Sequence, residues 1–268
     1  MRVVVESAWT DSTRKLLHDS REVHVWKINL DDAIDATTSL LGLLSEQERG
    51  QALRFYHKRD RSGYVISHVT LRMLLGGYLD VHPEAITFAM TAEGKPYLLP
   101  LPGKNPIGFN LSHSGRFAII GIASGREIGI DIEYLDWSFP IAEAARQVLT
   151  DRELDTLASL PERLRIPAFY RFWTMKEAYL KGVGTGVTRE MDSFEISVLP
   201  GKSAYHCCAA AVSKDAGNWI LLELPLMPGY ASALAVGFEP TTVRVFNVLP
   251  DACFGLLCLR DFCRSHPE

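Results

Sequence analysis

A short segment of alternating apolar and small or acidic residues, Ile128 to Glu133, constrains the fold of this chain more than any other. At the two-residue period of a β-strand its three isoleucines face one side, and Asp131 and Glu133 share the other side with a glycine. Neighbouring carboxylates repel each other, so such a pair is tolerable mainly where it is well solvated or holds a cation. The segment therefore predicts a strand with one apolar face and one acidic face that is solvated or occupied by a cation.

A third carboxylate, Glu177, follows in the later segment Trp173-Thr174-Met175-Lys176-Glu177. Together with Asp131 and Glu133 it would complete an oxygen-only site of three carboxylates, which suits Mg²⁺ better than Zn²⁺. The three acids are thus the candidate metal ligands.

The segment after Pro167 predicts a helix with an apolar stripe that has Lys176 in its middle. A buried ammonium without a partner is costly, so this lysine must either extend to the edge of the stripe or meet an anion, for example a site carboxylate. Glu177 and Lys181 lie four residues apart, which on its own favours an ordinary exposed ion pair. The run Gly182 to Gly186 should end the helix, either as a simple cap or as a mobile lip over a cleft.

Composition indicates an ordinary globular protein. The 268 residues are 47% apolar, enough for one large core or two smaller ones, and the net charge of -4 gives no general attraction to nucleic acid or membranes. Charge returns at Glu6 after three valines, too early for a signal peptide, and no apolar run reaches membrane-spanning length, so we expect a cytoplasmic protein. The five cysteines lack metal or redox spacing and should be reduced thiols. They are Cys207, Cys208, Cys253, Cys258 and Cys263.

The order of elements predicts an α+β fold made of two similar α/β halves. A capping box at Ser45 to Glu48 should start a helical region that extends to residue 79, and a polar turn at Ser112 to Gly115 should join two strands. We expect an N-terminal half at 1–124, a C-terminal half at 125–240 and a packed appendage at 241–268. The expected strands are 3–6, 23–29, 108–111, 117–122, 128–133, 193–198, 205–212, 219–224 and 231–236, and the expected helices are 45–79, 141–149 and the one that starts after residue 167.

Three places favour anion binding. The segment Arg54 to Arg61 holds four basic residues, a histidine and two aromatics on the expected helix, which fits a small phosphorylated ligand better than nucleic acid, although a solvated helix face explains it as well. His113 in its serine-flanked turn presents an imidazole and backbone N–H groups to an anion, unless it is merely solvated. Lys95, held by the following proline, is within reach of a phosphate or a purine edge, or is only a turn lysine.

Five motifs in this order resemble those of the Sfp-type phosphopantetheinyl transferases. The resemblance covers most of the chain, and its last three motifs are the most specific. The motifs are Arg54-Phe55-Tyr56-His57-Lys58, Gly94-Lys95-Pro96, Phe109-Asn110-Leu111-Ser112-His113-Ser114-Gly115, Gly129-Ile130-Asp131-Ile132-Glu133 and Trp173-Thr174-Met175-Lys176-Glu177-Ala178-Tyr179-Leu180-Lys181.

The resemblance implies a fold and a reaction. Members of this family transfer the phosphopantetheine arm of coenzyme A to a serine of an acyl, peptidyl or aryl carrier protein and release adenosine 3',5'-bisphosphate. They use Mg²⁺, with Mn²⁺ as an alternative. Their fold is a monomeric pseudo-dimer of two similar halves with the coenzyme in the cleft between them. We therefore expect an apo carrier protein and coenzyme A as partners, and neither nucleic acid nor a membrane.

The resemblance also assigns roles to residues. Asp131, Glu133 and Glu177 would hold the metal, and Glu177, Lys181 and His113 would act in catalysis, with either Glu177 or Lys181 as the base. The residues expected to bind the coenzyme are Arg54, Lys58, Arg59, Lys95, Ser112, His113 and Lys181.

The chain departs from the family where lysines would bind the coenzyme 3'-phosphate, because Glu48 and Gln51 stand there. One of the arginines would have to substitute, and the candidates are Arg49, Arg54, Arg59 and Arg61. Glu153 matches a family glutamate with a supporting role.

Two other functions fit the same residues, namely a coenzyme A or nucleotide-binding module without catalysis and a metal-dependent phosphoesterase. For a transferase, we expect the carrier to dock on apolar residues after the carboxylate strand and on the loop that follows Lys181, because carrier helices are acidic and offer a small apolar patch.

Overall fold

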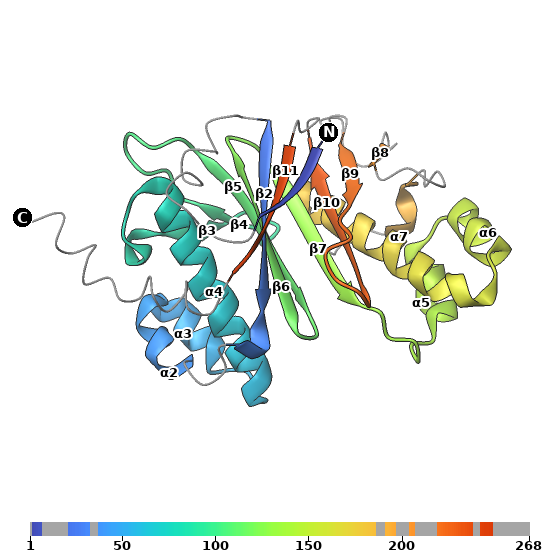
Figure 1. The fold of residues 1–268 in the computed structure, drawn as a ribbon, viewed down its shortest axis with the longest axis horizontal. Helices are drawn as coiled ribbons and strands as arrows, with labels where there is room; N and C mark the ends of the chain where they lie inside the picture. The colour runs from blue at the N-terminus through green and yellow to red at the C-terminus, as the bar shows by residue number, and fades with distance from the viewer. Residues whose placement is uncertain are drawn as a thin grey trace, which may run out of the picture.

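Two β-sheets packed against each other form the centre of the molecule, and helices cover their outer sides (Figure 1). The structure is a computed structural model, and it describes residues 2–6, 21–32, 37–185, 191–196, 204–206, 219–237 and 242–248. The expected mixed α+β fold with two α/β halves is confirmed. All five cysteines lie outside the described residues.

The N-terminal half is built on a five-stranded sheet in the order β1-β11-β2-β6-β5. Strand β11 is parallel to both of its neighbours, β1 and β2, whereas β6 is antiparallel to β2 and to β5. A separate hairpin is formed by β3 and β4. The strands are β1 (Arg2–Glu6), β2 (Glu22–Asn29), β3 (Phe88–Met90), β4 (Pro96–Leu98), β5 (Ile107–Ser114), β6 (Phe117–Ser124) and β11 (Thr242–Asn247).

Strand β11 comes from the segment expected to form an appendage, yet it lies inside the sheet of the N-terminal half. Its Val243 and Val245 are buried, and Phe246 stacks on Trp26 of β2 with ring centroids 4.3 Å apart. The chain thus returns from the C-terminal half to complete the first sheet. The proposed domain boundaries stay a prediction, with this strand as an addition to the first half.

Two helices replace the single helical region expected over residues 45–79. Helix α3 (Glu46–Ala52) begins at the predicted capping box, and helix α4 (Lys58–Leu79) begins after His57. The Arg54 to His57 segment therefore lies in a turn and not on a helix, which corrects the prediction. The ring centroids of Phe55 and Tyr64 lie 5.4 Å apart, so an aromatic contact holds the turn against α4. The shorter helical elements are α2 (Thr37–Leu40), η2 (Leu41–Leu43) and η3 (Pro83–Ala85).

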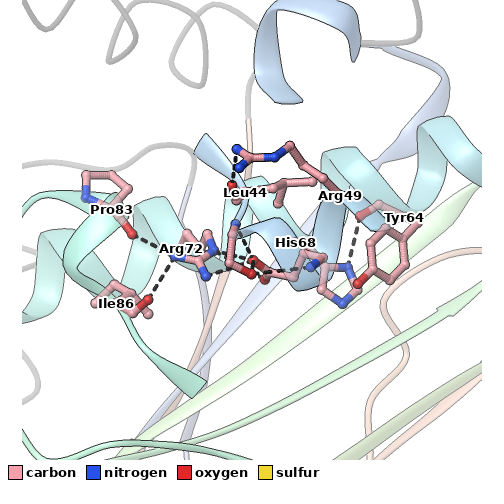
Figure 2. A network of polar contacts seen from close by, with 9 residues as sticks. Leu44, Arg49, Tyr64, His68, Arg72, Pro83 and Ile86 are labelled. Atoms are coloured by element: carbon pink, nitrogen blue, oxygen red, sulfur yellow. Dashed lines mark hydrogen bonds and ion pairs between the residues drawn. The ribbon is translucent and has the colours of Figure 1, made fainter. Parts of the chain in front are cut away.

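Glu48 is a structural residue of this half, and Figure 2 shows the surroundings of its partner Arg72. Its carboxylate accepts hydrogen bonds from the backbone N–H of Ser45 at 2.8 Å and from Arg72 Nε at 2.8 Å, and it lies 2.7 Å from Arg72 Nη2. Arg72, itself buried, also donates to the carbonyls of Pro83 and Ile86 at 3.0 and 2.8 Å. The carboxylate of Glu48 thus completes the capping box of α3 and neutralises the buried guanidinium of Arg72. Glu48 therefore has a structural role at a position where the family resemblance implies a phosphate-binding lysine.

The C-terminal half has a fully antiparallel sheet in the order β7-β10-β9-β8. Its helices lie on the side away from the N-terminal half (Figure 1). The elements are β7 (Ile128–Tyr134), α5 (Ile141–Val148), α6 (Asp151–Ser159), α7 (Glu162–Val183), η4 (Met191–Ser193), β8 (Ala204–His206), β9 (Ile220–Glu223) and β10 (Tyr230–Val236).

Helix α7 begins at Glu162, earlier than expected, and includes Pro167. The prediction of a start after Pro167 was wrong because a proline near the beginning of a helix removes one backbone hydrogen bond and does not prevent the remaining ones. Helix α6, which a second capping box at Thr150 and Glu153 begins, was not expected. Among the described helices, none combines the length and the hydrophobicity needed to cross a bilayer.

The apolar core has three parts. One lies beneath α4 in the N-terminal half, and one lies beneath α5 to α7 in the C-terminal half. The third lies between the two sheets, and it is formed largely by β-branched residues of β2, β7, β10 and β11 together with residues of β6 and β9. Because the third cluster buries one face of each sheet, the two halves form one packed body.

His24 on β2 is a fully buried histidine. Its Nδ1 lies 2.5 Å from the hydroxyl of Tyr78 on α4, and its ring packs edge-on against Phe246 of β11. The charged groups that face it are Glu22, 3.9 Å from Nε2, and Arg244 of β11. Burial, followed by the charge of Arg244, lowers the pKa of His24 from 6.5 to about 3.

We expect this histidine to destabilise the fold in acid. Because the unfolded chain binds a proton at His24 below pH 6.5 and the folded chain does not until about pH 3, stability should fall with pH across this window. The slope for one proton is at most about 1.4 kcal/mol per pH unit. Urea unfolding of wild type and His24→Gln, followed over this range, should show the extra acid loss in wild type alone. Parallel pH curves for the two proteins would contradict the assignment.

Candidate active site

The acidic face of β7 lies against helix α7, and the strand has the alternating faces that its sequence predicts. The three isoleucines of the strand, at positions 128, 130 and 132, are fully buried in the cluster between the sheets. Gly129, Asp131 and Glu133 alternate with them and so face the other way, toward the C-terminal helix layer. Strand β7 thereby lies between the apolar cluster that joins the two sheets and the candidate site.

Helix α7 approaches β7 closely at Gly129. A Cβ atom at this position would lie 1.9 Å from the carbonyl oxygen of Ala178 and 2.3 Å from the backbone nitrogen of Gly182. The strand next to β7 presents only small side chains at the paired positions, namely Ala231, Ala233 and Ala235. This close approach brings Glu177 and Lys181 of α7 to the carboxylates of β7.

Asp131 is the centre of the site. Its Oδ1 accepts hydrogen bonds from Lys181 Nζ at 2.6 Å and from Ser112 Oγ at 2.8 Å. Its Oδ2 is buried and has no hydrogen-bond partner among the described residues. Burial raises the pKa of this carboxyl, against the lowering by the Lys181 ammonium. A buried carboxylate oxygen without a donor is a feature that a bound cation would resolve.

Glu133 and Glu177 share the electrostatic field of Asp131. Burial, and then the charge of Asp131, raises the pKa of Glu133 to about 7, although Ser114 Oγ donates to it at 2.7 Å. Burial also raises the pKa of Glu177, with Asp131 adding to the rise and Lys181 opposing it. All three carboxyls are therefore easier to protonate than usual, which is the expected effect of crowding acids without a cation.

The residues fit a divalent ion in the kind of donor atoms that they offer. The donors are all oxygen atoms, as Mg²⁺ prefers, and Asp131 Oδ2 is free to bind. Within the described part of the chain, however, no three acidic, histidine or cysteine side chains are already arranged around one point as a metal cage. The three-carboxylate metal site thus stays a prediction, supported by the neighbouring charges of its members.

The expected turn at Ser112 to Gly115 is shorter than predicted. Residues up to Ser114 belong to β5 and pair with β6, with Ser112 opposite Ile119, so only Gly115, at φ 57°, and Arg116 form the turn. Because strand residues alternate in direction, Ser112 turns inward to Asp131 while His113 points to the other face of β5. The prediction that His113 lies in a turn was wrong, because Ser112, His113 and Ser114 all pair with residues of β6.

His113 is only partly withdrawn from solvent, and it belongs to the face of β5 whose Phe109 and Leu111 pack beneath helix α4. Withdrawal from water, and then the charge of Lys181, lowers the pKa of His113, while Asp60 and Asp131 oppose this change. The histidine is thus within the field of the site without sharing the face of Ser112.

Lys95 takes part in a contact between the halves. Its ammonium pairs with Glu127 and donates to the carbonyl oxygen of Gly182 at 2.8 Å, at the end of α7. Gly184, at φ 80°, caps that helix, so the helix ends within the predicted glycine run. Gly186 lies outside the described residues, and the choice between a simple cap and a mobile lip stays a prediction. In this arrangement Lys95 faces the helix end.

The three other residues expected to bind the coenzyme are exposed. Arg54 donates to Gln51 at 3.4 Å, and Arg59 lies 3.6 Å from Asp31. Lys58 begins helix α4. The structure shows them near the start of α4 and shows no contact between these described residues and the carboxylates of β7.

Lys176 meets an anion, and that anion is Glu153 rather than a site carboxylate. Both side chains are buried, and Nζ lies 2.7 Å from the carboxylate and donates to the carbonyls of Met191 and Phe194 at 2.8 and 2.7 Å. The other oxygen of Glu153 accepts from the backbone of Ile196 at 2.8 Å. The pair therefore fixes the segment that follows α7, which gives Glu153 a structural role.

Sequence comparisons cover both halves of the chain. The sequence model of the 4'-phosphopantetheinyl transferase superfamily matches residues 127–221, which include β7 and α7. The model of the 4'-phosphopantetheinyl transferase N-terminal region matches residues 32–125. Together they span the two sheets and the elements that carry the site.

Individual relatives agree with these matches. The 4'-phosphopantetheinyl transferase HetI of Nostoc sp. is 35% identical over 88% of this chain and 98% of its own length. The 4'-phosphopantetheinyl transferase Sfp of Bacillus subtilis is 32% identical over 58% of this chain and 67% of its own length. The mouse L-aminoadipate-semialdehyde dehydrogenase-phosphopantetheinyl transferase is 26% identical over 76% of this chain and 70% of its own length. With both halves matched and the carboxylate strand and helix in place, this chain belongs to the Sfp-type 4'-phosphopantetheinyl transferases.

Proposed function

We propose that this enzyme moves the 4'-phosphopantetheine arm of coenzyme A to a serine of an apo carrier protein in a Mg²⁺-dependent reaction that releases adenosine 3',5'-bisphosphate. The observation that carries the proposal is Asp131, a buried carboxylate with one oxygen bound by Lys181 and Ser112 and the other without a donor among the described residues. Such an oxygen suits a divalent ion beside a diphosphate.

The site supplies charge for phosphoryl transfer. The serine oxygen forms a bond to the β-phosphorus of coenzyme A, and the bond from that phosphorus to the oxygen of the leaving bisphosphate breaks. Negative charge builds on the phosphoryl oxygens, and catalysis consists mainly of positioning and neutralising this charge. The Lys181 ammonium, with its side chain partly exposed beside Asp131, is placed to do so. When bound, Mg²⁺ would add Lewis-acid stabilisation and orient the diphosphate.

We assign the role of base to Glu177 rather than to Lys181. The Lys181 ammonium already donates to Asp131 at 2.6 Å, whereas a carboxylate oxygen of Glu177 is an acceptor that can take the proton of the serine hydroxyl. Glu177→Gln should lower the rate of transfer by about 10²-fold with the coenzyme still bound. Rapid-quench transfer and a parallel coenzyme titration would check this. A Gln variant with the wild-type rate would assign the base to another group.

The nucleotide end of the coenzyme would lie near the start of α4. Arg54, Lys58 and Arg59 are exposed there, whereas Glu48 is committed to Arg72. These three exposed cations are the proposed phosphate contacts, with Lys95 free to join them if it leaves Glu127.

An exposed apolar surface after β7 supports the expected docking place of the carrier. Tyr134, the last residue of β7, is 51% exposed, and Trp137 and Phe139 beyond it are 59% and 38% exposed. This surface starts one residue after Glu133, so a carrier bound there would bring its serine to the acidic face. The loop beyond residue 185 lies outside the described residues.

The test is a transfer assay with several apo carriers, coenzyme A and Mg²⁺, read by intact mass. The proposal predicts a gain of one phosphopantetheine per carrier, release of adenosine 3',5'-bisphosphate, and loss of both on chelation of the metal. Binding of coenzyme A without any transfer would favour the non-catalytic module, and phosphate release without a carrier would favour the phosphoesterase. Comparing rates among carriers would also reveal the preferred partner.

A further inference from the structure

Strands β5 and β7 are the facing edges of the two sheets. Each is the last strand of its own sheet, and the two pack against each other although neither pairs with the other by a backbone ladder (Figure 1). An edge strand exposes backbone N–H groups that need acceptors. The seam between the halves therefore requires another source of hydrogen bonds.

Alternate side chains of β5 supply these bonds. Asn110 Oδ1 accepts from the backbone N–H of Ile130 at 2.8 Å, and Ser114 Oγ accepts from that of Tyr134 at 3.0 Å. Asn110 and Ser114 thus act as acceptors where a neighbouring strand would normally provide carbonyls.

The same row of side chains holds the carboxylates. Asn110, Ser112 and Ser114 share one side of β5, and the two serines donate to Asp131 Oδ1 at 2.8 Å and to Glu133 Oε2 at 2.7 Å. The bond from Asn110 differs from these because it fixes backbone rather than a carboxylate. The side chain of Asn110 accepts a hydrogen bond from the backbone N–H of Ile130, the residue immediately before Asp131. Asn110 is itself only 6% exposed.

We propose that Asn110 is a positioning residue for the metal site, a role that rests on the proposed function. By holding the Ile130 peptide it sets where β7 lies relative to β5, and hence where Asp131 meets Ser112 and Lys181. Loss of the Asn110 side chain should move the backbone that carries the metal ligand Asp131. Asn110 should therefore behave like other residues that orient metal ligands without touching the metal. Asn110 touches neither substrate nor metal in this role.

The test uses two variants at the position and one matched control. Asn110→Leu keeps the approximate size and removes the acceptor, whereas Asn110→Asp retains an oxygen for the Ile130 N–H. Ser232→Ala is the control because Ser232, on strand β10 next to β7, is also buried and donates to the carbonyl of Leu224. It measures the effect of losing one buried hydrogen bond.

Three readouts separate positioning from general stability. Hydrogen exchange of the Ile130 amide measures the hydrogen bond to Asn110. Titration with Mn²⁺, followed by electron paramagnetic resonance in the presence of coenzyme A and without carrier, measures the affinity of the metal site. Transfer kinetics measure kcat and the KM for coenzyme A. Asn110→Leu should expose the Ile130 amide and lower Mn²⁺ affinity and kcat by about 10- to 100-fold. Asn110→Asp should restore most of both, and Ser232→Ala should change only the melting temperature.

The proposal is overturned if Asn110→Leu binds Mn²⁺ and turns over like wild type, or if Ser232→Ala shows the same losses. It is also overturned if Asn110→Asp is as impaired as the leucine variant while its Ile130 amide is protected. A wild-type enzyme that modifies no carrier would reject the proposed function instead. The exchange and Mn²⁺ data would still decide the role of Asn110.

Discussion

Replacing Asp131 by asparagine is expected to lower the rate of carrier modification by about 10³-fold, the upper range for loss of one preorganised charge-stabilising group. The amide keeps the shape of the side chain but leaves Lys181 without its carboxylate partner and offers a neutral ligand in place of an ionised one. The free energy of unfolding should change little, because two contributions oppose each other. The variant loses the ion pair with Lys181, but it no longer buries a carboxylate, whose burial is unfavourable as its raised pKa shows. Intact-mass kinetics and urea unfolding would measure the two effects.

The matched control is Asp155→Asn, an exposed acid on α6. It should retain wild-type transfer and stability. If Asp131→Asn modified carriers within a few-fold of wild type, or failed only because it did not fold, the central position of this carboxylate would be wrong.

Adding a single methyl group at Gly129 should have a comparably large effect for a steric reason. The Cβ of alanine would overlap the Ala178 carbonyl and the Gly182 nitrogen, atoms of the α7 backbone that cannot turn aside. Helix α7 must move off β7, which costs about 1–3 kcal/mol or more for an overpacked interior. The movement also carries Glu177 and Lys181 away from Asp131. We therefore expect a lower melting temperature together with loss of transfer.

Gly50 is the appropriate comparison for Gly129. It lies in helix α3, and a Cβ there would meet no atom within 4 Å. Gly50→Ala should therefore be neutral or should stabilise the protein by about 0.5–1 kcal/mol, as alanine does in a helix interior. Equal behaviour of the two alanine variants would show that α7 does not rest on Gly129 as described.

Sequence reasoning identified the residues of the candidate site because they lie in locally regular segments. The alternation around Asp131 and Glu133 requires only the period of a strand, and the spacing of Glu177 and Lys181 requires only that of a helix. The capping box at Ser45 is equally local. Each of these features is confirmed in the structure.

The features that escaped prediction depend on long-range contacts. That Glu48 closes a buried pair with Arg72, or that Lys95 reaches the end of α7, depends on segments distant in sequence. The placement of β11 between β1 and β2 has the same cause. Asn110 was visible as a polar residue between Phe109 and Leu111, but its acceptor role requires knowing that β5 faces β7.

The most direct test of this account is a crystal structure of the enzyme with coenzyme A and Mn²⁺, read from the anomalous signal of the metal. The account predicts one strong peak that touches oxygens of Asp131, Glu133 and Glu177 at about 2.0–2.4 Å and also contacts the diphosphate of the coenzyme. A peak bound by other residues, or a coenzyme bound in the cleft with no metal near Asp131, would contradict it.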